Sequence, residues 1–193
     1  MNIQRYLHSD YLPLPLIAAM ILTRVLHFGD ALHLPGASLA VFFFAGFYRN
    51  KLLFGFLLAL AGIIDYVAIA NGTSAWCVSP AYAFLVPTYG VMWLGGRYCT
   101  TLPPAKVNKF RFFVWAIGLL SLATSLAFVI SNGSFYLFSG RYADLSWSQY
   151  LSRVAQYYPP YLSSTLIYAI VSYTLVSLVK TVVLIQESRH TAS

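Results

Sequence analysis

The sequence predicts an all-α integral membrane protein that folds as one transmembrane domain over residues 1–193. Charged residues make up 9% of the chain, whereas soluble domains carry about 25%. Hydrophobic residues make up 59% and occur in long uninterrupted runs, such as Leu52–Ile64. These runs are typical of membrane-buried helices. They do not alternate apolar and polar residues, as the strands of a transmembrane β-barrel do.

Six apolar segments are expected to form transmembrane helices. A spanning helix needs about 20 apolar residues, and fewer when it is short or re-entrant. The expected segments are Leu14–Phe28, Ala37–Tyr48, Leu52–Ala70, Ala81–Leu94, Phe112–Ile130 and Tyr161–Ile185. Pro13 and Pro15 are expected to open the first helix, where the first turn tolerates proline. Pro87 is expected to kink the fourth.

The basic residues predict the orientation of these helices. Two basic residues, Arg141 and Arg153, lie in the link between the fifth and sixth segments. Nine others lie in the N-terminal tail, in the second-to-third and fourth-to-fifth links and near the C-terminus: Arg5, Arg49, Lys51, Arg97, Lys106, Lys109, Arg111, Lys180 and Arg189. Because cytoplasmic loops are enriched in Lys and Arg, both termini are expected to be cytoplasmic. The net charge of +7 follows from this pattern, and no basic stripe suggests nucleic acid as a partner.

The expected external link Ser131–Pro160 is unusually long and rich in aromatic residues. Links of about 30 residues are more often functional than idle. One interpretation is an aromatic belt at the membrane surface; the other is a lid over a large, partly apolar ligand. Residues Asp144–Trp147 are expected to cap a short helix that runs through Val154. Trp147 and Arg153 are candidate ligand-binding residues in this link.

Several polar residues are expected near the external end of the helices. Arg24 and His27 lie one turn apart, Asp30 follows them, and Asp65 lies beside Tyr66 in the third segment. Charged groups within a membrane usually face a partner or a cavity. Two compatible interpretations follow: an Arg24–Asp65 ion pair between helices, or a polar pocket floor open to the outside. The candidate ligand-binding residues here are His27, Asp30, Asp65 and Tyr66, together with Tyr82 and Tyr89 of the fourth segment.

The segment Asn71–Pro80 holds Cys77, one of two cysteines, and has no basic residue. Cys99 is expected across a membrane core about 30 Å thick, too far for a disulfide, which needs Cα atoms within about 7 Å. Cys77 is therefore expected to be a free external thiol, with Trp76 and Ser79 as candidate ligand contacts.

Three roles for the Cys77 thiol stay open on the residues alone. It is an inert buried cysteine, a nucleophile with His27 as base, or an axial ligand to a metal carried in a haem or corrin ring. A zinc site needs about three or four protein ligands, and the sequence shows no motif that would supply them.

The stretch Ala61–Gly90, AGIIDYVAIANGTSAWCVSPAYAFLVPTYG, resembles the S-components of energy-coupling-factor (ECF) vitamin transporters. Within that class it is most similar to the solitary cobalamin-binding (BtuM-like) type. The resemblance implies a bacterial cytoplasmic-membrane protein that binds vitamin B12 (cobalamin) from the periplasmic side for uptake. It also implies that Cys77 ligates the cobalt of the cobalamin substrate and mediates decyanation of cyanocobalamin. No other protein-bound metal is expected.

The first helix departs from the wider class in one respect. S-components that dock on a shared energising module usually carry an Ala-x-x-x-Ala face on this helix. Here Ala18 and Ala19 are followed four residues on by Leu22 and Thr23, which weakens close helix packing. The lipid bilayer and cobalamin are the expected partners. An ECF energising module stays a possible partner that this helix face disfavours, and the energy source stays open. The alternatives are a membrane enzyme whose external thiol acts in haem or quinone redox chemistry, and an S-component for a different vitamin.

Overall fold

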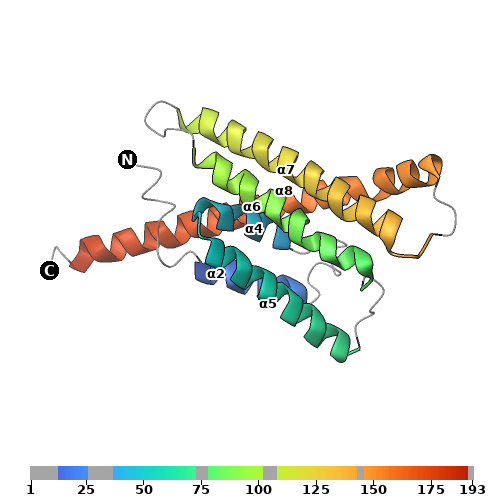
Figure 1. Ribbon diagram of the computed structural model, residues 1–193. Helices are drawn as coiled ribbons and strands as arrows, with labels where there is room; N and C mark the ends of the chain where they lie inside the picture. The colour runs from blue at the N-terminus through green and yellow to red at the C-terminus, as the bar shows by residue number, and fades with distance from the viewer. Residues whose placement is uncertain (1–12, 26–36, 73–77, 102–107, 143–145, 191–193) are drawn as a thin grey trace.

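Each apolar segment of the sequence contains a helix in the computed structural model, which describes residues 13–25, 37–72, 78–101, 108–142 and 146–190. These residues form no strand. The helices are α2 (Pro13–Val25), α4 (Ser38–Phe47), α5 (Lys51–Ala70), the 3₁₀ helix η2 (Pro80–Phe84), α6 (Leu85–Cys99), α7 (Lys109–Phe138) and α8 (Trp147–His190) (Figure 1). The all-α prediction is therefore confirmed.

Two of these helices are long and apolar enough to cross a membrane, judged by length and composition. They are α5, with a mean hydropathy of 2.3, and Phe110–Phe138 of α7, with 2.2. Only 17% and 28% of their most apolar windows are buried inside the protein, so both helices present mostly apolar outer surfaces. This suggests a membrane protein. By contrast, α4 has 10 residues and is about 15 Å long, half the thickness of a bilayer core.

The predicted long link Ser131–Pro160 is wrong in extent. Helix α7 continues to Phe138, and α8 already begins at Trp147. The helix ends have local causes. Gly140 adopts a φ of +69°, a left-handed conformation that commonly follows a helix C-terminus. The Ser146 hydroxyl accepts from the amide of Gln149 at 3.3 Å, as an N-cap does. Most of the aromatic residues of the predicted link therefore belong to the C-terminal end of α7 or to the first turns of α8. The helix predicted to run through Val154 is present as the start of α8.

The predicted kink at Pro87 is also corrected. The fourth segment changes from 3₁₀ to α-helix at Leu85, and Pro87 is the third residue of α6. The first turn of a helix has no internal partner for its amides, so proline costs little there. Pro87 therefore lies in the first turn of α6 and not in a helix interior, where a proline would bend the helix.

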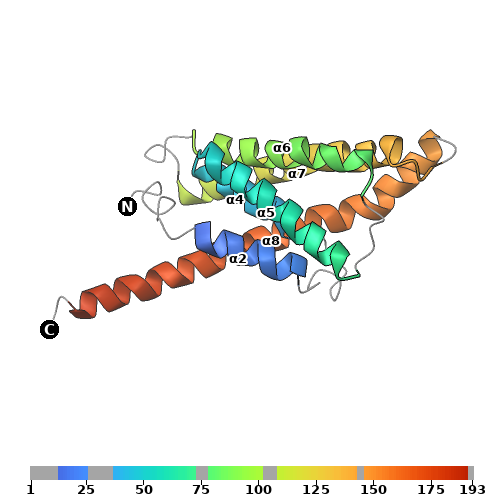
Figure 2. The same cartoon turned by 60° about the horizontal axis from the view of Figure 1, so that its bottom comes forward.

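Helix α4 lies at the centre of the bundle, between α6 on one side and α2, α5 and α8 on the others (Figures 1 and 2). All of its residues except Phe44 and Phe47 are buried. Its contact with α6 is close, because Gly46 and Gly96 let the two backbones meet. A Cβ atom on Gly46 would lie 2.7 Å from the amide nitrogen of Arg97, which leaves no room for a side chain.

The helices run alternately between two ends of the molecule. One end, here called the hairpin end, holds the C-terminus of α5, η2 and the turn between α7 and α8 (Figures 1 and 2). The opposite end, the basic end, holds the C-termini of α4, α6 and α8 and the N-termini of α5 and α7. Arg49, Lys51, Arg97 and Arg111 flank the α4–α5 and α6–α7 connections. The helix ends that border the two basic links predicted to be cytoplasmic therefore lie at the same end of the molecule as the C-terminus of α8.

We expect Gly96→Ala to destabilise the protein by about 2–3 kcal/mol, since overpacking a close contact typically costs 1–3 kcal/mol or more. Its new Cβ would overlap the carbonyl oxygen of Phe43 and lie 2.8 Å from the carbonyl carbon. Gly62→Ala is the matched control, because no atom lies within 4 Å of its Cβ position; it should change stability by less than about 1 kcal/mol. Thermal unfolding of the detergent-purified variants measures both, and equal stabilities would contradict the α4–α6 contact.

Candidate functional site

The Arg24 side chain is the centre of a polar network inside the helical bundle. Its Nη1 donates to Asp65 Oδ1 of α5 at 2.9 Å and to the backbone carbonyl of Ala61 at 3.0 Å. Its Nε donates to the Ser38 hydroxyl of α4 at 2.9 Å, and its Nη2 donates to the Tyr89 hydroxyl of α6 at 2.7 Å. One side chain on α2 therefore binds three neighbouring helices.

Two tyrosines complete this network. The Tyr82 hydroxyl of η2 donates to the second carboxylate oxygen of Asp65 at 2.7 Å. The Tyr89 ring is buried and stacks on Phe42 of α4, with the ring centroids 4.2 Å apart and the planes at 11°. Asp65 thus joins α2 to η2, the element that follows the segment holding Cys77.

The Arg24–Asp65 ion pair predicted from the sequence is confirmed, with side-chain exposures of 16% and 29%. Arginine has five N–H donors, and the four hydrogen bonds described above engage most of them. A buried charge needs such partners to offset its loss of hydration. The network is therefore suited to holding the helices together, and it leaves little of Arg24 for a ligand.

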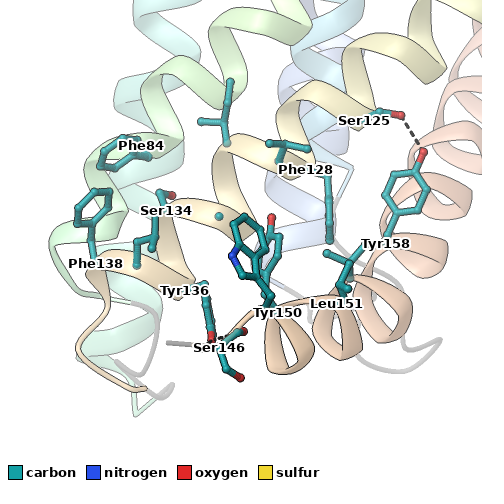
Figure 3. Close-up of a pocket in the computed structure, with 16 residues that line it drawn as sticks. Phe84, Ser125, Phe128, Ser134, Tyr136, Phe138, Ser146, Tyr150, Leu151 and Tyr158 are labelled. Carbon is teal, nitrogen blue, oxygen red and sulfur yellow. Dashed lines mark hydrogen bonds between the residues drawn. The ribbon is translucent and has the colours of Figure 1, made fainter. Parts of the chain in front are cut away.

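A large cavity lies at the hairpin end, between the C-terminal half of α7 and the start of α8 (Figure 3). Its volume is about 1010 Å³, at the upper end of the range for small-molecule sites. It is lined by Phe84, Ser125, Phe128, Val129, Ile130, Gly133, Ser134, Tyr136, Leu137, Phe138, Ser146, Trp147, Tyr150, Leu151, Val154 and Tyr158. The predicted ligand contact Trp147 is among them.

Aromatic rings form the walls of this cavity. Phe84 of η2 stacks on Phe138 of α7, with centroids 5.2 Å apart and planes at 9° (Figure 3). Phe128 meets Tyr158 edge to face at 5.2 Å. On the α8 side, the lining residues recur every three or four positions and so share one helix face: Trp147, Tyr150, Leu151, Val154 and Tyr158. The arrangement suits a wide ligand with apolar faces.

Arg153 lies beside this cavity but does not line it. Its guanidinium carbon lies 4.7 Å from the ring centre of Tyr142 and 4.9 Å from that of Tyr157, within the range of cation–π attraction. Phe135 of α7 is a third ring partner at 5.9 Å. Arg153 therefore braces the α7–α8 turn, and the structure does not bring it to the cavity as a ligand contact.

The remaining predicted ligand-binding residues do not line the cavity in the described part of the chain. Tyr66 is 75% exposed and also lies outside the Arg24 network. The Ser79 hydroxyl is enclosed and has no hydrogen-bond partner within the described part of the chain. Tyr82, Tyr89 and Asp65 meet in the Arg24 network. Four predicted residues lie outside the described ranges: His27, Asp30, Trp76 and Cys77.

The described residues also bear on the two cysteines and on metal binding. Cys99 is buried at the C-terminus of α6, at the basic end. The helices before and after the segment 73–77 are α5 and η2, whose adjoining ends lie at the hairpin end (Figure 1). Within the described ranges, no three His, Cys, Asp or Glu side chains gather as metal ligands would.

Most residues of the cavity lining are not among the site residues predicted from the sequence. The prediction for Ser131–Pro160 was an aromatic belt or a lid. The interval from Trp147 to Tyr150, Val154 and Tyr158 was the available signal, because it marks a single helix face. Phe84 carried no such signal, since its pairing with Phe138 depends on tertiary structure.

We expect Asp65→Asn to lower the free energy of unfolding by about 2–3 kcal/mol, because Arg24 would keep a partly buried charge without its counter-ion. The adjacent substitution Tyr66→Phe is the control and should stay within about 0.5 kcal/mol, as most changes at exposed positions do. A double-mutant cycle with Arg24→Gln, read by thermal unfolding, isolates the pair. A coupling energy near zero would contradict the role assigned to the network.

No protein-family model matches this chain, and no curated protein sequence matches it. The residue pattern around Cys77 and the geometry of the hairpin end are therefore the observations that bear on function.

Proposed function

We propose that this protein is a six-span membrane transporter of the S-component type that binds cobalamin at its external face for uptake. The observation that carries the proposal is the wide aromatic cavity at the hairpin end. The helices that flank the segment holding Cys77 have their adjoining ends at the same end of the molecule (Figure 1). Phe84, which lines the cavity, belongs to η2, the first helix after that segment.

The chemistry of the cavity supports a tetrapyrrole-like ligand. A corrin is a broad ring with two largely apolar faces, and aromatic side chains such as Phe128 and Trp147 pack well against such faces. The ring supplies four nitrogens to its cobalt, so the protein needs to add only one soft ligand. Cys77 is the residue proposed for that bond. The described cavity lining has no charged side chain, which suits a ring held by packing and one axial bond.

Ligand exchange at cobalt follows from this proposal. The Cys77 thiol loses its proton, and the sulfur donates an electron pair to Co(III). The cobalt–carbon bond to cyanide breaks, and cyanide leaves with its electron pair and takes up a proton. Cobalt keeps its oxidation state, so no reductant is needed. The sulfur takes the axial position that the lower base leaves, so the cobalamin is base-off, and a water molecule fills the position that cyanide leaves on the opposite face.

The helix directions support the membrane arrangement in this proposal. The connections at the basic end are the ones rich in Lys and Arg, so that end is proposed to be cytoplasmic. Helices α5 and α7 have the length and apolarity of complete spans. The remaining four helices, α2, α4, α6 and α8, are proposed to complete the six-span bundle, with the shorter ones packed around α4.

We expect protein purified after growth with cobalamin to be coloured, to contain about one cobalt per chain and to show a corrin spectrum shifted by sulfur ligation. Cys77→Ala should abolish the spectral shift and the loss of cyanide from cyanocobalamin. Cys99→Ala is the matched control, because it removes the other thiol and should leave both unchanged. A haem spectrum would instead favour the redox-enzyme alternative. A decyanation rate unaffected by Cys77→Ala would refute the proposed ligand.

The proposed orientation predicts thiol labelling in intact cells. A membrane-impermeant maleimide should label Cys77 on the periplasmic side, whereas Cys99 is fully buried and should not react. In a Cys77→Ser background, a cysteine introduced at the exposed residue Thr101 of the basic end should react only in inside-out vesicles. Labelling of Thr101→Cys from outside would reverse the proposed topology.

A further inference from the structure

We propose that the outer face of α7 at the basic end binds an anionic phospholipid, with the lipid headgroup at Arg111 and one acyl chain along the helix. This inference goes beyond cobalamin binding. It shares with the proposed function only the placement of the basic end at the cytoplasmic surface of a membrane. It follows from a second groove, which lies apart from the aromatic cavity and carries a charge at one end.

This groove follows the first turns of α7 and has a volume of about 420 Å³. Its described lining residues all belong to α7: Phe110, Arg111, Val114, Trp115, Gly118, Leu119 and Leu122. They recur every three or four positions along the helix and so share one face. Phe110, Val114 and Leu122 are each more than half exposed. The groove therefore lies on the outside of the bundle, where lipid would surround it.

Gly118 leaves room for a chain in the middle of the groove. No atom lies within 4 Å of the position that a Cβ atom would take on this residue. Trp115 and Leu122, the lining residues about one turn before and after it, lie on the same helix face. A flexible apolar chain can therefore lie against the helix backbone at Gly118, between these two side chains.

The length of the groove matches one leaflet of a bilayer. From Phe110 to Leu122 the helix rises about 18 Å, at 1.5 Å per residue. The hydrocarbon core of a bilayer is about 30 Å thick, so each leaflet contributes about 15 Å. Phe110 is also the residue at which the apolar span of α7 begins. The groove therefore has the position and length expected for an acyl chain that lies parallel to the helix in the cytoplasmic leaflet.

The charge at the basic end of the groove favours an anionic headgroup. Arg111 is exposed, and the ion pair among the described residues joins Arg24 to Asp65 instead. Residues 95–122 contain no Asp or Glu and four basic residues: Arg97, Lys106, Lys109 and Arg111. A guanidinium binds phosphate through parallel hydrogen bonds, and basic residues at a cytoplasmic surface attract anionic lipids. A zwitterionic lipid would bring its own cation into this basic surrounding.

Two aromatic rings lie next to the charged end of the groove. Trp115 lines the groove, and the ring of Tyr98 from α6 lies beside it, with the ring centroids 6.2 Å apart. Tryptophan and tyrosine are enriched where a membrane meets water. Along α7 the order is thus a cation, an aromatic pair and an apolar groove. This order matches the headgroup, the glycerol region and the acyl chain of a phospholipid.

Native mass spectrometry of the detergent-purified full-length protein tests the headgroup preference. The probes are three lipids with identical acyl chains: anionic phosphatidylglycerol and the zwitterionic phosphatidylethanolamine and phosphatidylcholine. We expect phosphatidylglycerol to bind about 5-fold more tightly than the other two. Arg111→Gln should remove this preference. Lys51→Gln is the matched control and should keep it, because it removes a basic residue at the same end but from α5. Equal binding of the three lipids, or a preference that survives Arg111→Gln, would overturn the inference.

A second substitution tests the acyl-chain part of the site. Gly118→Leu fills the groove and should weaken phosphatidylglycerol binding at least about 4-fold, the equivalent of one buried CH₂ group. Gly62→Leu is the control, because its Cβ position on α5 is equally open, and it should leave binding unchanged. Glycerol 3-phosphate, a soluble headgroup without chains, should not displace the lipid. Displacement by glycerol 3-phosphate, or no effect of Gly118→Leu, would show a site for free phosphate and contradict the proposed lipid.

Fluorescence quenching locates the bound lipid. Brominated phosphatidylglycerol, as a minor component of phosphatidylcholine nanodiscs, should quench more tryptophan fluorescence than the same amount of brominated phosphatidylcholine. Trp115→Phe should remove this excess, whereas Trp147→Phe should keep it, because Trp147 lines the aromatic cavity at the other end. An excess that depends on Trp147 and not on Trp115 would place the lipid in the aromatic cavity and refute the inference.

These outcomes are distinguishable from failure of the proposed function. Absence of the lipid preference in protein that still shows the Cys77-dependent corrin spectrum refutes only the lipid site. An Arg111-dependent lipid preference in protein that binds no corrin supports the lipid site and refutes only the proposed function.

Discussion

A guanidinium inside an apolar bundle must find its hydrogen-bond partners within the protein, and this constraint on Arg24 connects five of the described helical elements. The side chain starts on α2 and binds α4, α5 and α6. Asp65 extends the same network to η2 through Tyr82. Leaving any one of these groups buried without a partner costs more than its hydrogen bond contributes. The helices around Arg24 are therefore held together by polar groups that have no better alternative in an apolar surrounding.

This network depends in turn on how closely α4 and α6 approach each other. Gly46 and Gly96 let the two backbones come into contact, and the same approach stacks Tyr89 on Phe42 beside Arg24. In the membrane proposed for this protein, the hydrophobic effect would not drive helices together, so close packing between small residues and interhelical hydrogen bonds would carry more of the association. Both features meet at α4, which explains how a helix of 10 residues can occupy the centre of the fold.

The helices and the Arg24–Asp65 ion pair could be predicted from the sequence, whereas the residues that line the cavity could not. Long apolar runs mark helices whatever their neighbours are, and Arg24 and Asp65 stood out because charges are rare in such runs. The ends of α7 and α8 were missed because residues 131–160 are polar and aromatic, and no apolar run marked them as helical. The stacking of Phe84 on Phe138 joins residues from different helices, and no local pattern encodes that contact.

The cavity and the Arg24 network differ in how far apart along the chain their residues lie. Apart from Phe84, every described residue that lines the cavity lies between Ser125 and Tyr158, whereas Arg24 must reach partners up to 65 residues away. Closing a short loop costs less entropy than closing a long one, and local contacts form faster than distant ones. The α7–α8 hairpin can thus acquire its shape as a local unit, and the N-terminal helices can dock afterwards. Variation in the N-terminal helices would then alter the assembly of the bundle more than the shape of the cavity.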